Sequence, residues 1–528
     1  MRDLHFPGRS VAYGAHGAVA TSQQLSSSLA MEVLRHGGNA IDAALTASAA
    51  QCVIEPHNTG IGGDCFALYW RADQHKLYGM NGSGWAPAGL SDQGLLDQGI
   101  SSIAPESIHA VTVPGAVDAW SKLLADHGTR SFADILAPAI DLAEHGFHVH
   151  ERAAADWEEE VTKLQADEGA RSHLLIDGRA PKAGERMRFP QLAATLRLLA
   201  AEGRDAFYQG AIAEDLVGFL RSKGGTHTLA DFSDFSTQYV EPISASYRGV
   251  DLFQIPPSGQ GLTALVLLKI LDGFSLKGLD PVGADRFHVQ IEATQLAYSV
   301  RDAFVADPAF AHVPVDELLS DRFIASLRDK IDLKKASANL SHGSTNFQRD
   351  TIYLTVADRW GNVCSFINSL YFSFGTGMVS PKTGISVQNR GACFRVEPGH
   401  PNTVAPRKRP LHTIIPAMAM KGGKPWLSYG VMGGAYQPVG QAHVLQNLLD
   451  FGMNIQEAFD APRGFRKLDA FEGERGIPES VMLDLAMRGH PVTRPVMPLG
   501  GGQGILLAHD GAYQVGTDPR KDGAALAY

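Results

Sequence analysis

Residues 350–358, Asp-Thr-Ile-Tyr-Leu-Thr-Val-Ala-Asp, contain the change of pattern that decides the fold of this chain. The stretch before them, residues 333–350, is polar and has few core-forming side chains, which predicts an exposed loop. From Thr351 onward the hydrophobic period is two, because alternate residues in 352–356 are apolar. The sequence therefore predicts that a strand begins at Thr351, directly after a loop that ends at Asp350.

The segments on either side support a mixed α and β fold. Residues 358–361, Asp-Arg-Trp-Gly, predict a turn, and residues 362–370 predict a second strand that pairs with the first as a hairpin. Helical spacing in the first third of the chain predicts a helix that Gly37-Gly38 ends and an Ala-rich helix that Asn39 caps. Further helices are predicted by the patterns of 134–144 and 190–221.

Composition limits the classes of function. The chain has 528 residues, 44% of them hydrophobic and 19% charged, which is an ordinary globular balance. The net charge of −10 is spread along the chain and no Lys/Arg stripe is present, which excludes nucleic acid and anionic membrane as expected partners. The basic run Arg407-Lys408-Arg409, between two prolines, predicts a solvated turn.

Cysteine content and hydropathy bear on the compartment. The chain has four cysteines and no CxxC pair, which favours neither a disulfide framework nor a zinc site. No apolar stretch is long enough to predict a membrane span. Residues 1–5 lack a basic segment followed by an apolar run, which predicts no signal peptide and a cytoplasmic location.

A series of short motifs identifies a family. Together with the Thr351 strand pair, these motifs are Leu34–Ala44, Gly60–Asp64, Val113–Val117, Phe374–Gly377, Gly384–Ile385, Asn389, Lys408–Leu411, Gly433–Gly434 and Ala461–Arg463. Each is weak alone, but in this order over nearly the whole chain they resemble the γ-glutamyltranspeptidase family.

The resemblance implies an α+β fold, the four-layer αββα sandwich of N-terminal-nucleophile hydrolases. It implies that a precursor cuts itself between Asp350 and Thr351 into a large chain, 1–350, and a small chain, 351–528, which stay associated as one intertwined unit. It implies no cofactor and no metal. A dimer of such two-chain units is left open.

The predicted cut gives Thr351 the chemistry of a nucleophile. A threonine hydroxyl is a poor nucleophile at neutral pH and needs a base beside it. The amino group freed by the cut has a reference pKa of about 7.7–8.0, so it can accept the hydroxyl proton near pH 7. By resemblance, Gly433 and Gly434 donate backbone N–H groups to the oxyanion, and Ser369 positions the Thr351 hydroxyl.

The expected substrate pocket departs from the family pattern. Family transpeptidases hold a glutamyl group by its α-carboxylate and its α-amino group. Where the carboxylate-binding Arg is expected the chain has Ser83, and where the ammonium-binding acid is expected it has Cys393. The remaining departures are Tyr371 in place of Asn, Arg390 in place of Gln, and His412-Thr413 in place of Ser-Ser. The predicted pocket comprises Tyr371, Asn389, Arg390, Cys393, His412 and Thr413.

These departures predict an amide substrate that carries a carboxylate but no α-amino group. Without an acid at position 393 nothing pairs a substrate ammonium, whereas Arg390 and His412 add positive or donor character. The alternative for Arg390 is a local salt bridge, for example to Glu397. The segment 393–410 is short and predicts an open site, in which hydrolysis is favoured over transfer.

Oxamate, hydrolysed to oxalate and ammonia, is the preferred small-molecule substrate. A glutaryl-type acylase and a γ-glutamyl hydrolase or transpeptidase acting on glutathione-like compounds are the alternatives. A further class is a protein that cleaves itself but is catalytically degenerate and only binds ligands. His145, His148, His150 and Glu151 are a weak candidate for a metal cluster, because they lack HExxH spacing and the chemistry needs no metal.

Overall fold

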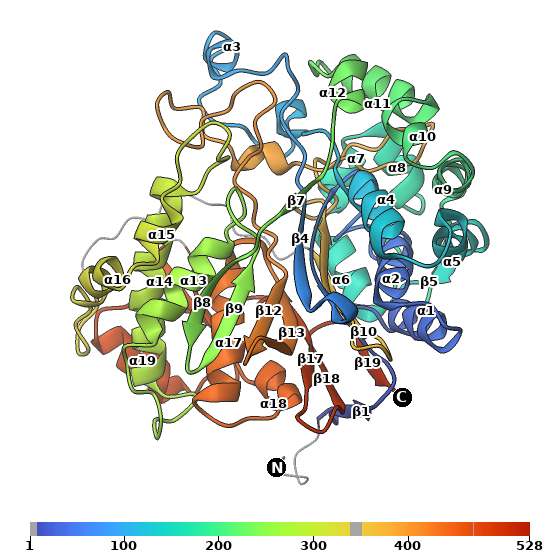
Figure 1. Cartoon of the computed structure of the whole chain (residues 1–528). Helices are drawn as coiled ribbons and strands as arrows, with labels where there is room; N and C mark the ends of the chain where they lie inside the picture. The colour runs from blue at the N-terminus through green and yellow to red at the C-terminus, as the bar shows by residue number, and fades with distance from the viewer. Residues whose placement is uncertain (1–7, 338–350, 468) are drawn as a thin grey trace.

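The centre of the protein is a pair of seven-stranded sheets that lie face to face between two layers of helices (Figure 1). The computed structural model describes residues 8–337, 351–467 and 469–528. All neighbouring strands in both large sheets run antiparallel. The architecture is the predicted αββα sandwich of the α+β class.

Each sheet combines strands from before and after Thr351. In spatial order, the first sheet contains β1 (Ala12–Gly14), β18 (Tyr513–Thr517), β17 (Gly501–Leu507), β13 (Lys424–Met432), β12 (Ala417–Lys421), β9 (Val250–Gln254) and β8 (Ile243–Tyr247). The second sheet contains β19 (Ala524–Ala527), β2 (Ala18–Thr21), β10 (Ile352–Ala357), β11 (Val363–Ser369), β3 (Asp64–Arg71), β4 (Lys76–Gly82) and β7 (Gln238–Val240).

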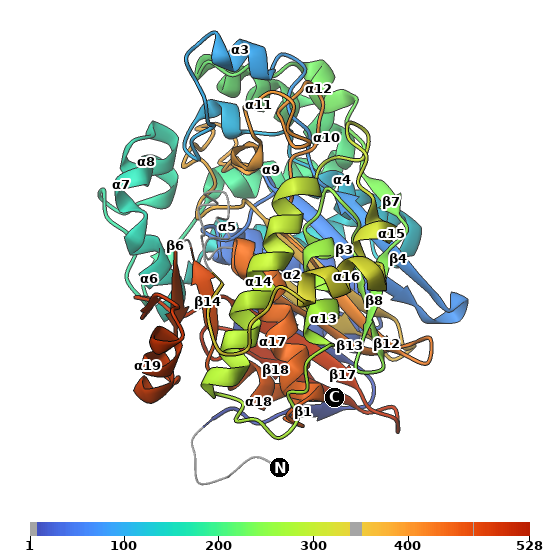
Figure 2. The ribbon, with the colours of Figure 1, turned by 90° about the vertical axis from the view of Figure 1, so that its left-hand side faces the viewer.

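The outer face of each sheet is covered by its own helices. On the first sheet lie α13 (Gly261–Leu271), α17 (Gln437–Leu449) and α18 (Ile455–Asp460), with α14 (Ala284–Phe304) packed on α13, and Figure 2 views this layer face-on. On the second sheet lie α1 (Gln24–Arg35), α2 (Ala40–Ile54) and α4 (Ala116–His127), with α5 (Phe132–His145) packed on α2 and α9 (Pro190–Glu202) packed on α5.

Smaller elements surround this sandwich. The other helices are α3 (Asp92–Leu96), α6 (Glu151–Glu159), α7 (Val161–Gln165), α8 (Glu168–Leu174), α10 (Arg204–Tyr208), α11 (Ala211–Ser222), α12 (Leu229–Ser233), α15 (Val315–Leu318), α16 (Asp321–Arg328) and α19 (Glu479–Met487). Two small sheets are formed by β14 (Gly464–Lys467), β15 (Ala470–Gly473) and β16 (Val492–Thr493), and by β5 (Phe147–His148) and β6 (Arg186–Met187).

Strand β10 is buried on both faces because it lies within the sandwich. Ile352, Leu354 and Val356 pack against the helices of the second sheet. Tyr353 points the other way, into the apolar layer between the two sheets. The predicted alternation and the predicted hairpin are both confirmed, since β10 pairs antiparallel with β11. This register places Ser369, at the end of β11, beside the start of β10.

The predictions for the helices are mostly confirmed. Helix α2 begins after Asn39, whose side chain accepts hydrogen bonds from Ile41 and Asp42, and every residue of the helix is buried. The prediction of one helix over 190–221 is wrong. The segment forms α9, α10 and α11, which are separated at Gly203 and Gly210, and Gly203 takes a positive φ of 69° that a helix cannot continue.

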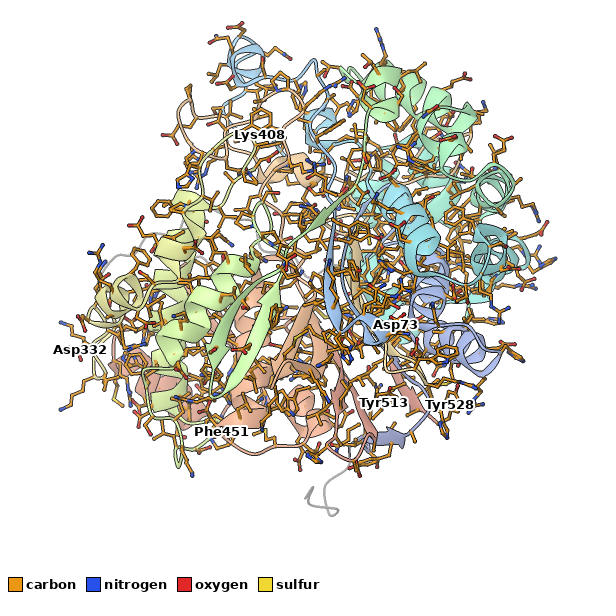
Figure 3. All side chains as sticks on the ribbon, in the orientation of Figure 1. Asp73, Asp332, Lys408, Phe451, Tyr513 and Tyr528 are labelled. Carbon is orange, nitrogen blue, oxygen red and sulfur yellow. The ribbon has the colours of Figure 1, made fainter. Side chains whose placement is uncertain are left out.

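The basic run also differs from its prediction. Arg407 is exposed and ion-paired with Asp234, but Lys408 and Arg409 are buried, so the run is not a fully solvated turn. Lys408 lies in the upper part of the molecule, away from the chain terminus at Tyr528 (Figure 3). Within the described part of the chain, no helix is long and apolar enough to cross a lipid bilayer.

Candidate active site

Thr351 lies at the junction that the sequence indicated, immediately before β10, and is almost completely buried. Its Oγ is 3.1 Å from the Ser369 Oγ. Its nitrogen donates to the Asn58 Oδ1 at 3.4 Å. The Ser369 Oγ also accepts a hydrogen bond from the Tyr371 N–H at 2.9 Å, which leaves its own proton available for the Thr351 Oγ. Asp350, the other residue of the predicted cleavage site, lies outside the described residues.

Gly433 and Gly434 form a sharp turn between β13 and α17. Their φ angles are 117° and 54°, in the region that favours glycine, and Gly434 opens the short 3-10 helix η4 (Gly434–Tyr436). The Gln260 amide donates to the Gly434 carbonyl at 2.9 Å and to the Thr413 carbonyl at 2.7 Å. Gln260 therefore ties the glycine turn to one of the predicted pocket residues.

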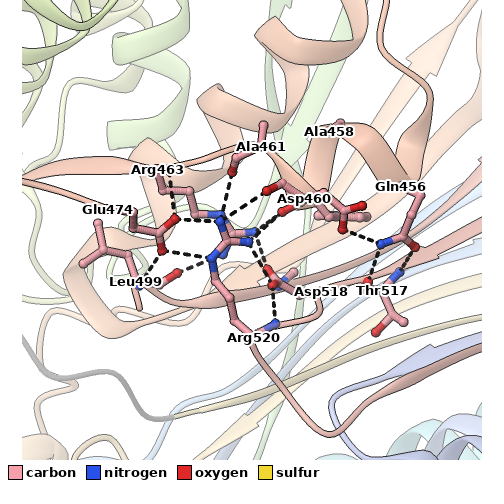
Figure 4. Close-up of polar contacts among 12 residues, drawn as sticks. Gln456, Ala458, Asp460, Ala461, Arg463, Glu474, Leu499, Thr517, Asp518 and Arg520 are labelled. Carbon is pink, nitrogen blue, oxygen red and sulfur yellow. Dashed lines mark hydrogen bonds and ion pairs between the residues drawn. The ribbon is translucent and has the colours of Figure 1, made fainter. Parts of the chain in front are cut away.

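A buried network of charged residues supports the same turn (Figure 4). Arg463, from one of the motifs that identified the family, is buried, pairs with Asp518, and donates to the Leu499 carbonyl at 2.8 Å. The next residue, Gly500, packs so closely that a Cβ added to Gly433 would lie 3.3 Å from its Cα. The network thus fixes the segment against which the glycine turn rests.

Arg390 is the most unusual residue of the site. It opens the short helix η3 (Arg390–Cys393), is completely buried, and its Nη1 donates to the Thr413 Oγ at 2.7 Å. Its Nε and Nη2 have no hydrogen-bond partner among the described residues. The guanidinium lies 4.1 Å from the centre of the Tyr371 ring. The alternative of a surface salt bridge with Glu397 is wrong, because Arg390 is buried and does not contact that carboxylate.

Tyr371 has a strained backbone. Its φ is 84°, in the left-handed region where Asn is far more common than an aromatic residue. The family pattern has Asn at this position, so the backbone suits the family residue better than the one present. Strain of this kind costs about 1–3 kcal/mol and is found mostly at functional sites. Here the aromatic ring covers the Arg390 guanidinium.

His412 contributes no positive charge to the pocket, contrary to one part of the prediction. Its Nε2 lies 3.0 Å from the Asp64 Oδ2 and both side chains are completely buried. Burial and the nearby charge of Arg390 lower the pKa of His412 to about 4, although Asp64 opposes the shift. The imidazole is therefore neutral near pH 7 and donates its Nε2 proton to Asp64.

The other predicted pocket residues have different surroundings. Both ends of the Asn389 amide are bonded to backbone, since Oδ1 accepts from Phe372 N at 3.1 Å and Nδ2 donates to the Pro105 and Gly375 carbonyls. Cys393 is partly exposed. Ser83, which stands where the family pattern has an Arg and was not among the predicted pocket residues, is buried, and its carbonyl accepts a hydrogen bond from Arg409 at 3.0 Å.

A cavity of about 500 Å³ adjoins these residues. Its wall includes Tyr371, Cys393, Thr413 and Ala435, the last of which directly follows the glycine turn. The rest of the wall comes from residues 101–105, from the end of α14 and from the segment 393–411. The structure thus brings three of the six predicted pocket residues, Tyr371, Cys393 and Thr413, to one cavity next to the glycine turn, whereas Asn389, Arg390 and His412 are not part of its wall.

The histidines proposed as a metal cluster do not converge. The His145 Nδ1 is 2.8 Å from Asp141, and the His148 Nδ1 is 2.9 Å from the Gly184 carbonyl, both at the surface. Over residues 8–337, 351–467 and 469–528, no group of three or more His, Cys, Asp or Glu side chains is placed to hold a metal ion.

Two residues of the site, Asn58 and Gln260, were not predicted from the sequence. Asn58 comes just before the motif that begins at Gly60, and that proximity was the available signal. Gln260 begins no recognisable motif.

Comparison with known proteins identifies the family and agrees with the fold. The sequence profile described as Gamma-glutamyltranspeptidase matches residues 26–528. The chain is 37% identical to the glutathione hydrolase-like YwrD proenzyme of Bacillus subtilis (strain 168), over 97% of this chain and 98% of the relative. It is 34% identical to the oxamate amidohydrolase proenzyme of Klebsiella pneumoniae, over 97% of this chain and 98% of the relative. The crystal structure of the cephalosporin acylase from Bacillus halodurans superposes with a TM-score of 0.92 at 37% identity, covering 100% of this chain and 99% of that one.

The fold and these relatives define an N-terminal-nucleophile hydrolase that acts on amides. Within that class, the chain belongs to the γ-glutamyltranspeptidase family.

Proposed function

We propose that the chain cuts itself between Asp350 and Thr351 and that Thr351 then hydrolyses a small amide that carries a carboxylate. The observation that carries the proposal is the environment of Thr351. Its hydroxyl contacts Ser369 at 3.1 Å while its nitrogen faces an amide oxygen at 3.4 Å, so one residue holds both reacting groups in defined positions. The names of the relatives, which are proenzymes, agree with processing of a precursor.

The proposed reaction proceeds in two steps. The Thr351 Oγ attacks the amide carbonyl carbon while the free α-amino group takes the hydroxyl proton. The same proton passes to the leaving nitrogen as the amide C–N bond breaks, which releases ammonia or an amine and leaves an ester on Thr351. Water then attacks the ester while the amino group accepts a proton from it, and that proton returns to the Thr351 Oγ as the ester C–O bond breaks, which releases the acid and restores the free hydroxyl.

The glycine turn stabilises the negative charge that develops on the carbonyl oxygen of the substrate. We assign the backbone N–H groups of Gly433 and Gly434 to this oxyanion, and Gln260 and the Arg463 network hold the turn in place. Removal of one such donor typically costs about 3–4 kcal/mol of the activation barrier. Ser369 orients the Thr351 hydroxyl through its 3.1 Å contact.

Arg390 supports a substrate with a carboxylate. Two of its nitrogens lack partners among the described residues, and a guanidinium binds a carboxylate through two parallel hydrogen bonds. Ser83 and Cys393, at the positions where the family has charged residues for a glutamyl group, offer no charge to pair with an α-carboxylate or an α-ammonium. Oxamate meets both conditions, and one relative is named for this activity.

A glutaryl-type acylase is the second candidate, and the size of the cavity favours it. A volume of about 500 Å³ falls in the range that holds drug-sized ligands, whereas oxamate has only two carbons. The likeness to the cephalosporin acylase points the same way. The predictions of a cytoplasmic location and of a dimer of two-chain units stand as proposals with their own tests, fractionation and light scattering.

One paired experiment tests the proposal. Intact mass spectrometry should give two chains that meet at Asp350 and Thr351, and Thr351→Ala should remain a single inactive chain. Turnover of oxamate, glutarylamides and γ-glutamyl anilides, measured with and without EDTA, then assigns the substrate. An unbroken wild-type chain with activity would refute the cleavage, and γ-glutamyl compounds as much the best substrates would refute the role of Arg390. A cut chain that turns over none of them would indicate a binding protein.

A further inference from the structure

We propose that Glu55 positions the catalytic amino group of Thr351 by fixing the orientation of the Asn58 amide. Resting on the function proposed above, the inference adds a positioning pair that lies outside the substrate pocket. Glu55 is the C-cap residue of α2, and Asn58 lies in the turn that follows, where its side chain contacts Thr351 at the start of β10.

The hydrogen bonds run in one direction. The Thr351 nitrogen donates to the Asn58 Oδ1 at 3.4 Å, and the Asn58 Nδ2 donates to the Glu55 Oε1 at 3.1 Å. The Glu55 Oε2 accepts from the Ser22 Oγ at 2.6 Å and from the Gln51 Nε2 at 2.7 Å. All three neighbours of the carboxylate donate to it, which is the pattern of an ionised acid.

This pattern determines which end of the Asn58 amide faces the nucleophile. An ionised carboxylate can only accept hydrogen bonds, so Asn58 must turn its NH2 group to Glu55 and its oxygen to Thr351. The Asn58 main chain is fixed as well, because its carbonyl accepts from Leu370 N at 3.4 Å, beside Ser369. Asn58 and Glu55 are 1% and 4% exposed, so water cannot replace these bonds without opening the core.

The place of Glu55 on its helix argues against a purely structural role. A negative charge at the C-terminal end of a helix is opposed by the helix dipole, so the carboxylate does not stabilise α2. Burial raises the pKa of Glu55, and the hydrogen bonds it accepts and the charge of Lys521 only partly offset that effect. The residue thus occupies a position that is unfavourable for the stability of its own helix.

The charged groups around the pair are also defined. The Lys521 Nζ is 3.6 Å from the Asp156 Oδ2, and Arg152 pairs with the same carboxylate at 2.8 Å. The His57 Nε2 lies 3.6 Å from Asp156, but burial lowers the pKa of His57 to about 3, so it is neutral near pH 7. Glu55, and none of these four side chains, is the charged group for which a hydrogen bond to Asn58 is described.

In the cut enzyme, the Asn58 oxygen accepts one N–H of the free amine, which directs the nitrogen lone pair toward the Thr351 hydroxyl. The negative charge of Glu55 stabilises the protonated amine through Asn58. The pKa of the Thr351 amine is lowered either by loss of that charge or by rotation of the Asn58 amide so that its NH2 group faces the amine. Either change also moves the amine away from its position beside the hydroxyl.

The test uses Glu55→Gln. A glutamine has a single oxygen for three donors, so once it accepts from Ser22 and Gln51 its NH2 group faces Asn58, which must rotate. We expect kcat to fall about 10- to 100-fold, with KM within about twofold, because the amine acts on chemistry rather than on binding. The acid limb of the kcat profile should move to lower pH by about 0.5 unit.

The exchange variant Glu55→Gln with Asn58→Asp provides the rescue. The glutamine introduced at position 55 can donate to the aspartate, which again presents an oxygen to the amine, now with its charge closer. We expect kcat to recover at least partly and the acid limb to move above that of the single variant. Asp358→Asn is the matched control, because Asp358 is equally buried but lies at the far end of β10.

All rates are expressed per mole of cut chain, measured by intact mass. A cut, active Glu55→Gln enzyme with unchanged kcat and pH profile would overturn the inference, as would an exchange variant no better than the single variant in cutting and turnover. An Asp358→Asn enzyme with the same shift of the acid limb would also overturn it. An uncut but active wild type would instead contradict the function proposed for Thr351, so the two failures are distinguishable.

Discussion

Replacement of Arg390 by Gln or Met gives the sharpest test of substrate recognition. The guanidinium is completely buried, donates one hydrogen bond to Thr413, and makes no ion pair with any residue that the structure describes. Gln is the residue that the family pattern has here, and Met has a similar length without polar atoms. Either change removes the charge while it keeps most of the volume beside Tyr371.

The expected loss of activity follows from the two guanidinium nitrogens that lack partners among the described residues. A hydrogen bond to a charged group contributes about 1.5–3 kcal/mol, and Gln can replace part of one of them. The net loss is about 2–4 kcal/mol, which corresponds to a decrease of about 30- to 1,000-fold in kcat/KM. The effect should fall mostly on KM, since the carboxylate is held in both the ground state and the transition state.

The expected change in stability has the opposite sign. An unpaired buried cation is costly, and its replacement by an apolar side chain is neutral or stabilising by up to about 4 kcal/mol. Arg390→Met should therefore unfold at an equal or higher temperature than the wild type while it loses activity. A carboxylated product added in excess should raise the melting temperature of the wild type and leave that of Arg390→Met unchanged.

The assay compares a carboxylated amide with its neutral analogue, each with wild type and both variants, alongside thermal unfolding. Equal losses on the charged and neutral substrates would refute the assignment of Arg390 to the carboxylate. So would a large fall in the melting temperature, because it would mean that the charge is compensated within the protein.

Four further changes have expected outcomes. Ser369→Ala removes the 3.1 Å contact to the Thr351 Oγ and should lower kcat about 10-fold with little change in KM, as measured by steady-state kinetics on the cut enzyme. Gly433→Ala, at φ 117°, should cost about 1–3 kcal/mol of backbone strain and lower kcat, whereas an unchanged kcat would remove the glycine turn from the mechanism. Arg463→Met leaves Asp518 with one cationic partner among the described residues and should lower the unfolding free energy by about 3–5 kcal/mol, as measured by denaturant titration. Folding lowers the pKa of His412 from 6.5 to about 4, so the folded state binds fewer protons than the unfolded state. The resulting contribution to the free energy of unfolding, about 3 kcal/mol, is present above pH 6.5 and is lost as the pH falls toward 4. His412→Gln should therefore flatten the pH dependence of stability in that window.

The parts of the site that the sequence predicted are those set by local pattern. The alternation after Thr351 and the turn at 358–361 predicted the hairpin, and its register places Ser369 next to Thr351, whereas the role of Ser369 itself was inferred from the family resemblance. Gly433 and Gly434 were likewise recognised from a short motif, and the positive φ angles of this turn explain why the motif consists of glycine.

The parts that the sequence did not predict depend on contacts between distant segments. Asn58 meets Thr351 across 293 residues, and His412 meets Asp64 across 348. Burial and the nearby charge of Arg390 keep His412 neutral despite Asp64, so of the positive or donor character expected from its residue type, it retains only the donor character. Burial likewise removes the surface salt bridge considered for Arg390.

The mixing, in both sheets, of strands from before and after Thr351 affects how the enzyme is inactivated by heat. In the second sheet β10 and β11 lie between β2 and β3, and the first sheet likewise combines strands from before and after Thr351. After the proposed cut, two separate polypeptides would therefore hold each sheet together. Folding of the precursor is unimolecular, but recovery of a denatured mature enzyme requires two fragments to find each other in solution and rebuild both sheets at once. Heat inactivation should therefore be effectively irreversible and limited by the rate of unfolding, whereas the uncut Thr351→Ala protein should refold at any dilution.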